Sequence, residues 1–104
     1  MTPETLNLPP SLSIRGIVPV HESLLEALQM HKAVTIDIPA DAQTDLSFIQ
    51  LIESSRLYAR ANGKYITLTK PASASVVDTL RRGGFLTNMD EASRLFWLHG
   101  KEIQ

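Results

Sequence analysis

The sequence predicts a single α/β domain, and two features carry that prediction. Short segments with alternating or β-branched residues are interleaved with longer segments in which apolar residues recur at helical spacing. Prolines and glycines stand between these segments but do not separate stretches of different composition. The 104 residues are therefore expected to form one domain over residues 1–104, with its core at about 5–98.

The first half of the chain predicts three strands and one helix. Residues 5–8 alternate between polar and apolar up to Pro9-Pro10, and residues 11–16 alternate again, which favours two neighbouring strands or a hairpin. Between Val20 and Met30 the apolar residues recur at helical spacing. Residues 33–38 are β-branched and apolar and end at a proline, which indicates a central strand.

The strongest helical segment of the chain covers residues 45–62. Thr44 or Asp45 can cap its start, and Asn62-Gly63 supplies a stop at its end. Residues 65–69 follow as a strand and complete a strand–helix–strand unit. Such a unit implies parallel neighbouring strands and a right-handed crossover.

Two further helices are expected near the end of the chain. The first covers residues 73–82, with Ser75 and Asp78 at capping-box spacing. The second opens at the capping sequence 88–91 and reaches about residue 98. In this order the elements predict a mixed sheet of about four to five strands, with helices packed mainly on one face.

The composition is that of a globular protein and excludes several kinds of site. With 43% hydrophobic and 20% charged residues, the chain can form a core without disulfides. Ten Lys and Arg stand against eleven Asp and Glu, so the basic excess that binds nucleic acid is missing. The absence of cysteine excludes disulfides, thiolate metal sites and cysteine nucleophiles.

The start of the chain and its hydropathy predict a cytoplasmic protein. Residues 1–4 lack the basic and apolar regions of a secretory signal. No apolar run approaches the roughly 18 residues of a membrane span. We therefore expect no direct insertion into a membrane.

Residues that could carry catalysis or bind a metal do not form a motif. Asp37, Asp41 and Asp45 fall four apart, which permits a magnesium site at the end of a strand. Pro39 separates them and no phosphate-binding glycine loop accompanies them, so a loop aspartate and a helix cap are the preferred interpretation. The three histidines lie on different predicted elements without metal-ligand spacing. We expect neither an enzyme nor a cofactor or metal site.

The two faces of the helix over residues 45–62 differ in an informative way. At about 100° per residue, one face gathers a core stripe: Phe48, Leu51, Ile52, Ser55 and Ala59, flanked by Ile49. The opposite face carries Leu46, Gln50, Glu53, Leu57 and Arg60. Two leucines on the expected solvent side indicate either incidental exposure or a surface for a partner.

The order of these motifs resembles the STAS domain family, named for sulfate transporters and anti-sigma factor antagonists. The resembling segments are a strand ending in aspartate (34–38), an Asp-led helix start (44–52), a helix closing on glycine (61–64) and a following unit with Pro71 and Gly83-Gly84-Phe85. The opening Leu8-Pro9-Pro10-Ser11-Leu12 and Gln50-Leu51 are similar to the standalone bacterial branch. The resemblance covers most of residues 5–87.

The resemblance implies a non-catalytic regulatory module that binds a partner protein. In the sigma-factor branch, a serine or threonine directly after the helix-start aspartate is phosphorylated by a partner kinase. Here Asp45 holds the aspartate position and Leu46 the acceptor position, so the hydroxyl of the usual switch is missing and Ser47 and Thr44 are the candidate substitute acceptors. The implied docking surface is Thr44, Asp45, Leu46, Ser47, Gln50, Glu53 and Leu57.

Two kinds of partner are consistent with the resemblance. The first is a kinase, either an anti-sigma factor or a chemotaxis-type histidine kinase. The alternative is the ATPase of a lipid-asymmetry ABC transporter, to which the chain would bind as a structural subunit. Leu46 is compatible with both, because each requires an interface more than a switch.

Overall fold

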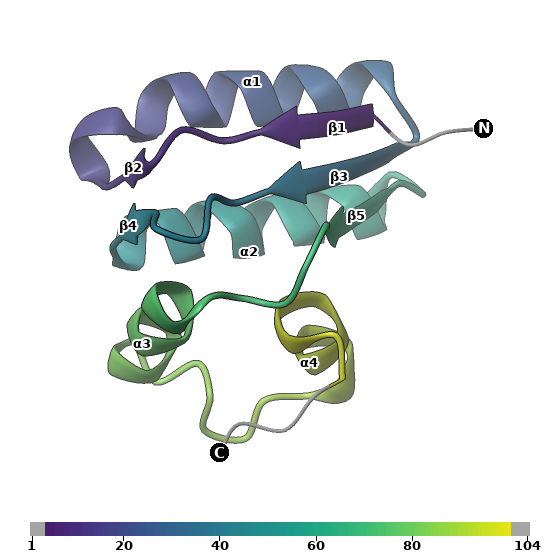
Figure 1. Cartoon of the computed structure of the whole chain (residues 1–104). Helices are drawn as coiled ribbons and strands as arrows, with labels where there is room; N and C mark the ends of the chain where they lie inside the picture. Colours follow the sequence, from purple (N-terminus) through teal and green to yellow (C-terminus); the bar gives the residue numbers. More distant parts are fainter. Residues whose placement is uncertain (1–3, 101–104) are drawn as a thin grey trace.

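The computed structural model describes residues 4–100, and its strands form two small sheets (Figure 1). The larger sheet has the spatial order β1-β3-β5, and the smaller sheet pairs β2 with β4. Every strand pair is parallel. The five strands are β1 (Glu4–Asn7), β2 (Ser11–Leu12), β3 (Ala33–Asp37), β4 (Gln43–Thr44) and β5 (Tyr65–Leu68).

The smaller sheet continues the larger one along the chain. Beyond β1 and β3, the Leu8 N–H donates to the carbonyl oxygen of Asp37 at 3.0 Å. The Gln43 N–H then donates to the carbonyl oxygen of Pro10 at 2.8 Å, just before β2 and β4 pair. The paired strands therefore form one long ribbon. The amino ends of β1 and β3 lie at one end of this ribbon, and the start of the helix that follows β4 lies at the other end.

The helices form one layer behind the sheet and a second group beside it. Helices α1 and α2 lie next to each other behind the strands, whereas α3 packs beside β4 and α2, and α4 packs beside β5 (Figure 1). A short 3₁₀ helix, η1, leads directly into α1. The helical elements are η1 (Ile14–Gly16), α1 (Ile17–Met30), α2 (Leu46–Ala61), α3 (Ala74–Arg82) and α4 (Glu91–Leu98).

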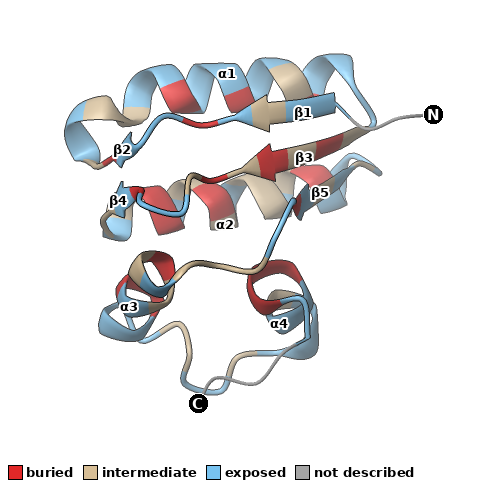
Figure 2. Cartoon of the chain, viewed as in Figure 1, coloured by how far each residue is buried: buried red, intermediate tan, exposed pale blue. Residues whose placement is uncertain are grey.

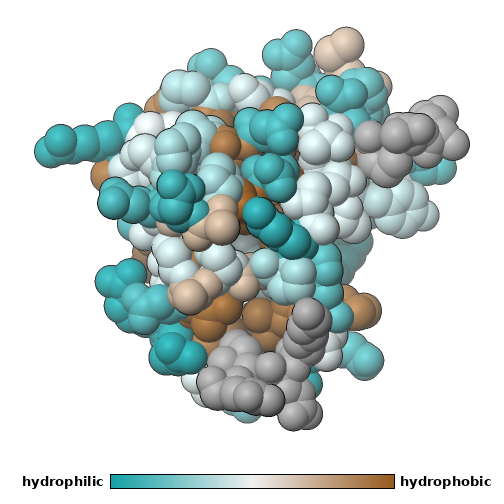
Figure 3. All heavy atoms as spheres, in the orientation of Figure 1, coloured by the Kyte–Doolittle hydropathy of each residue, from teal (hydrophilic) through white to brown (hydrophobic). Residues whose placement is uncertain are grey.

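The two faces of the larger sheet differ in chemistry. On β3, Val34 and Ile36 are buried toward the helices, and the buried sides of α1 and α2 face the strands (Figure 2). The opposite face carries hydroxyl and carboxylate groups, with Thr35 bonded to Thr67 at 3.3 Å and the Thr69 hydroxyl donating to Asp37 at 2.7 Å. Polar and neutral side chains cover much of this face, and hydrophobic ones gather over α3 and α4 (Figure 3).

The α/β class and the packing of helices on one face of the sheet are confirmed, and the pairing of the first two strands is a correction. The two neighbouring strands or hairpin expected from residues 5–8 and 11–16 are not formed, because β1 and β2 each pair with a strand that follows α1. Pro9-Pro10 explains the difference, since proline has no N–H for a ladder and its fixed φ prevents a tight reversal here. In place of one mixed sheet of about four to five strands, the described residues form parallel sheets of three and two strands, and residues 14–16 form η1 instead of a strand.

The N-cap residues of α3 and α4 differ from those that the sequence spacing predicted. Ser73 is the N-cap of α3, and the Ser75 hydroxyl donates to the carbonyl oxygen of Ala42 at 2.7 Å, which links α3 to the loop before β4. At α4 the cap is Asp90, which accepts the Ser93 N–H at 2.8 Å. Serine and aspartate near a helix start are frequent in several positions, so spacing alone did not identify the cap.

The core is closed by Trp97 of α4, the only tryptophan in the chain. Its side chain is fully buried, and Phe96 packs against it edge to face with ring centroids 5.0 Å apart. The indole N–H donates to Glu53 Oε1 of α2 at 2.9 Å. This bond joins the last helix to the middle of α2 and satisfies a donor that burial would otherwise leave unpaired.

We predict that Trp97→Phe lowers the free energy of unfolding by about 1–3 kcal/mol, because a buried hydrogen bond to a carboxylate is lost together with packing volume. Denaturant unfolding followed by circular dichroism measures the change. Tyr65→Phe is the control, since Tyr65 is 64% exposed and its variant should stay within about 0.5 kcal/mol of the original chain. Equal stability of the two variants would contradict the role given to the indole bond.

Candidate functional surface at the start of α2

Asp45 organises the start of α2 through four hydrogen bonds. Its backbone is extended, and its Oδ1 accepts the N–H of Ser47 at 3.0 Å and that of Phe48 at 3.4 Å. The Ser47 hydroxyl also donates to Oδ1. The second oxygen, Oδ2, accepts the Ile14 N–H at 2.9 Å. One carboxylate therefore caps α2 and ties it to η1, which precedes α1.

These bonds favour the charged form of the carboxyl group. The hydrogen bond from the Ser47 side chain is the main cause that lowers the pKa of Asp45, and the N–H groups of Ile14, Phe48 and Ser47 lower it further. Partial burial acts in the opposite direction and is outweighed. Asp45 is thus an ionised cap at neutral pH, at the positive end of the helix dipole.

Both hydroxyls considered as phosphate acceptors are used within the fold. Thr44 is half-buried, and its Oγ1 lies 2.7 Å from Oγ1 of Thr79, a buried residue of α3. Ser47 is half-buried and donates to Asp45. Phosphorylation of either residue would have to break one of these bonds.

The two leucines expected on the solvent side of α2 are exposed, as predicted. Leu46 is 44% exposed and Leu57 is 66% exposed, and Gln50 between them is also exposed. The Leu46 side chain lies close to Gly83 at the end of α3, since a Cβ placed on this glycine would lie 2.9 Å from Leu46 Cδ1. The core stripe is confirmed for Phe48, Ile49, Ile52 and Ala59, which are buried, whereas Leu51 and Ser55 are half-buried.

Glu53 contacts other residues of the fold rather than standing free on this surface. Arg56 Nη1 lies 2.9 Å from Oε2, and Trp97 donates to Oε1 at 2.9 Å. Sequence spacing could not show the second contact, because Trp97 lies 44 positions away. The rest of the predicted docking surface is the α2-start surface, which we define as the exposed Leu46, Gln50 and Leu57 together with the half-buried Thr44, Asp45 and Ser47.

The remaining charged candidates do not assemble into a site. Asp37 accepts the Thr69 hydroxyl and Asp45 caps α2, and no three His, Cys, Asp or Glu residues within residues 4–100 are placed to hold a metal ion. His31 lies 3.7 Å from Glu4, and His99 bonds to the carbonyl oxygen of Leu68. Of the helices over these same residues, none has the length and hydrophobicity to cross a membrane.

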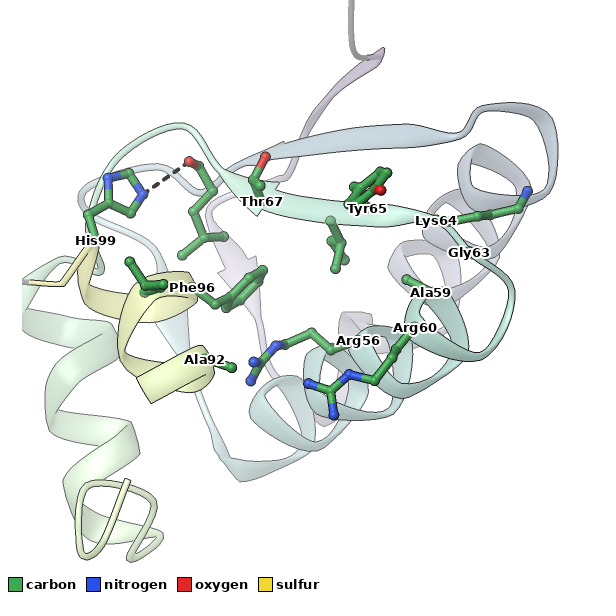
Figure 4. A pocket seen from close by; sticks show the side chains of 13 residues that line it. Arg56, Ala59, Arg60, Gly63, Lys64, Tyr65, Thr67, Ala92, Phe96 and His99 are labelled. Atoms are coloured by element: carbon green, nitrogen blue, oxygen red, sulfur yellow. Dashed lines mark hydrogen bonds between the residues drawn. The ribbon is translucent and has the colours of Figure 1, made fainter. Parts of the chain in front are cut away.

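One feature had no signal in the sequence. A cavity of about 750 Å³ opens between β5, the second half of α2 and α4, at the opposite end of α2 from Asp45 (Figure 4). Its lining residues come from two separate stretches of the chain, 56–68 at the end of α2 and in β5 and 92–99 at α4, so no single local pattern marks it.

Comparison with protein-family models, with curated proteins and with solved structures found no match for this chain. The resemblance to the STAS domain therefore stays a prediction. The geometry of the α2-start surface is independent of it.

The Asp45 cap gives a stability prediction with a defined pH dependence. Asp45→Ala should lower the free energy of unfolding by about 1–2 kcal/mol at neutral pH, whereas Asp45→Asn keeps an oxygen acceptor and should cost less. Because the folded pKa is below the unfolded value of about 3.9, the charged cap stabilises the fold fully above that value. Its contribution is lost as pH falls through the folded pKa.

Urea unfolding of the original chain and of Asp45→Asn at about pH 6 and about pH 2.5 tests this dependence, and the difference between them should be smaller in acid. Asp41→Asn is the matched control, because Asp41 is an exposed loop residue. A difference that stays constant from neutral pH to acid would show that the Asp45 charge does not stabilise the fold.

Proposed function

We propose that this protein is a non-catalytic regulatory module that docks on a partner protein through the α2-start surface. The observation that carries the proposal is the pair of exposed leucines, Leu46 and Leu57, on one stripe of a helix whose other face is in the core. Large apolar side chains ringed by polar groups are typical of the centre of a protein interface. Here Gln50 and the hydroxyl and carboxylate groups at the helix start supply the polar surround.

The rigidity of the surface supports this use. Phe48 and Ile52 anchor α2 in the core, and Asp45 fixes its first turn to η1. A surface held in one conformation before binding loses less entropy on association than a flexible loop does. The leucines are thus presented at a fixed spacing along α2.

We propose a kinase as the partner, either an anti-sigma factor or a chemotaxis-type histidine kinase, as the STAS resemblance implies. Leu46 stands at the position of the family's phosphate acceptor and has no hydroxyl, so binding here does not depend on a switch at that position. A phosphate on Ser47 would place about two negative charges beside the Asp45 carboxylate and would weaken the α2 cap.

A pull-down with the immobilised full chain, followed by mass spectrometry, identifies the partner class. Recovery of a signalling kinase supports the proposal. Recovery of a transporter ATPase in its place would favour the alternative of a structural transporter subunit, and recovery of no specific protein would contradict docking altogether.

The surface itself is tested by Leu57→Ala and Leu46→Ala. Leu57→Ala should leave the free energy of unfolding within about 0.5 kcal/mol and weaken partner binding by about 1–3 kcal/mol. Leu46→Ala should weaken binding similarly, with a small loss of stability because Leu46 packs near Gly83. Calorimetry of binding and thermal melting of the free chain measure both quantities.

Two control variants separate docking from folding. Ile52→Ala removes a fully buried side chain and should lower the free energy of unfolding by about 2–5 kcal/mol. Met30→Ala removes a side chain that is 70% exposed at the far end of α1 and should leave binding unchanged. The docking model is wrong if Leu46→Ala destabilises the free chain as much as Ile52→Ala, or if Leu57→Ala binds as well as Met30→Ala.

A further inference from the structure

The cavity between β5, α2 and α4 has an apolar wall built from all three elements. Its volume of about 750 Å³ lies in the range of small-molecule sites. The apolar lining is contributed by Ala59 of α2, Ile66 and Leu68 of β5, and Ala92, Leu95 and Phe96 of α4. The Phe96 ring points into the space, opposite β5 (Figure 4).

The charged side chains that line the cavity are all basic. Arg56 and Arg60 lie one helical turn apart on α2, and Lys64 follows beyond the end of the helix. Lys64 Nζ bonds to the carbonyl oxygens of Leu28 and Gln29 at the end of α1, so its charge is used there. No carboxylate side chain is among the described residues that line the cavity.

The two arginines differ in how they are held. The Arg56 side chain is 12% exposed and is fixed by Glu53 at 2.9 Å, by Ser93 Oγ at 3.1 Å and by its position 4.8 Å above the Phe96 ring. Arg60 is exposed, and its charge helps to lower the pKa of the Asp90 carboxyl group, but it makes no ion-pair contact within residues 4–100. Arg60 is therefore the cation that remains available at the mouth of the cavity.

The edge of β5 adds backbone polarity to the apolar wall. The N–H groups of Tyr65 and Thr69 donate toward the β3 side, to Lys32 and Ile36, at 2.8 and 3.0 Å. Because successive residues of a strand direct their backbone groups to opposite edges, Ile66 directs its N–H and carbonyl toward the cavity. The next outward carbonyl, that of Leu68, accepts a hydrogen bond from His99 Nε2 at 3.2 Å.

We propose that this cavity binds a small amphipathic anion, a carboxylate or phosphate that carries an alkyl or aryl group. The anionic group lies on the Arg60 guanidinium, and the apolar body lies against Ile66, Leu68 and Phe96. Charge-assisted hydrogen bonds to arginine are the strong interactions of such a site. The apolar wall supplies the burial that an inorganic ion could not use.

A peptide strand added to the β5 edge is disfavoured as the occupant. Strand addition requires a run of unpaired backbone groups along an accessible edge. Here α4 packs beside β5, and the His99 side chain already occupies the Leu68 carbonyl. The accessible edge is too short for a ladder, whereas a compact ligand needs only the cavity.

The experiment is a titration of the isotope-labelled full chain, followed by amide chemical shifts, with three probes of equal chain length: octyl phosphate, octanoate and octylammonium. The two anions should shift the amides of Ile66, Leu68 and Phe96 in a saturable way. Octylammonium should bind at least about tenfold more weakly, since the charged side chains that line the cavity are basic. The relative affinity of the phosphate and the carboxylate identifies the preferred headgroup.

Three variants test the assignment of residues. Arg60→Gln should weaken the binding of both anions about tenfold, and Arg60→Lys should restore part of the loss. Arg81→Gln is the matched control, because Arg81 is an exposed arginine on α3 away from the cavity. Ala92→Trp places a bulky side chain at the lining and should abolish binding, with circular dichroism to establish that the chain is folded.

Several outcomes would overturn the proposal. Equal binding of octylammonium and octanoate would show apolar adsorption without charge recognition. Shifts confined to the residues around Leu46 and Gln50 would place the probes on the α2-start surface. Inorganic phosphate binding as tightly as octyl phosphate would show that the apolar wall does not contribute to binding. An extended acidic peptide that competes with octanoate and shifts the amide signals of all β5 residues would favour strand addition. The cavity and the docking surface are read out by different amides, so either can fail without the other.

Discussion

The Asp45 carboxylate is the interaction on which the arrangement of this fold depends. Its two oxygens serve two segments, since Oδ1 caps α2 and Oδ2 holds the backbone of Ile14 at the entrance to α1. The first turn of α2 is thereby fixed to η1, the short helix that leads into α1. Because β2 and β4 end directly before these two helical elements, the same group also holds the end of the strand ribbon.

A second carboxylate performs a similar task in the middle of α2. Glu53 accepts the indole N–H of Trp97 and pairs with Arg56, and Arg56 in turn covers the Phe96 ring. Between α4 and α2 this cluster adds directional contacts to apolar packing, which is not directional. The cluster therefore sets the distance between α4 and α2, and this distance defines the width of the cavity.

Local patterns predicted the helices well and the strand pairing poorly. The α2 stripe of Phe48, Ile52 and Ala59 follows from a period of 3.6 residues, which a single segment contains completely. Pairing is a property of two segments, and residues 5–8 and 11–16 carry the same alternation whether they pair with each other or with strands beyond a helix. Glu53 shows the same limit of local patterns. Its charge predicted a solvent-exposed side chain, but in the structure it accepts a hydrogen bond from the buried indole of Trp97, 44 positions away.

The helix α2 links the two surfaces that the structure offers. Leu57 belongs to the α2-start surface, and Arg60, three residues later, is its neighbour on the helix and stands at the mouth of the cavity. A partner that covers Leu57 consequently lies beside the guanidinium group that would hold an anion. By thermodynamic linkage, any change that the anion causes in partner affinity is matched by an equal change that the partner causes in anion affinity. The sign of that coupling depends on the charge that the partner brings to Arg60. An acidic partner competes with the anion for the Arg60 guanidinium. An apolar partner removes water from around the guanidinium and strengthens its attraction to the anion.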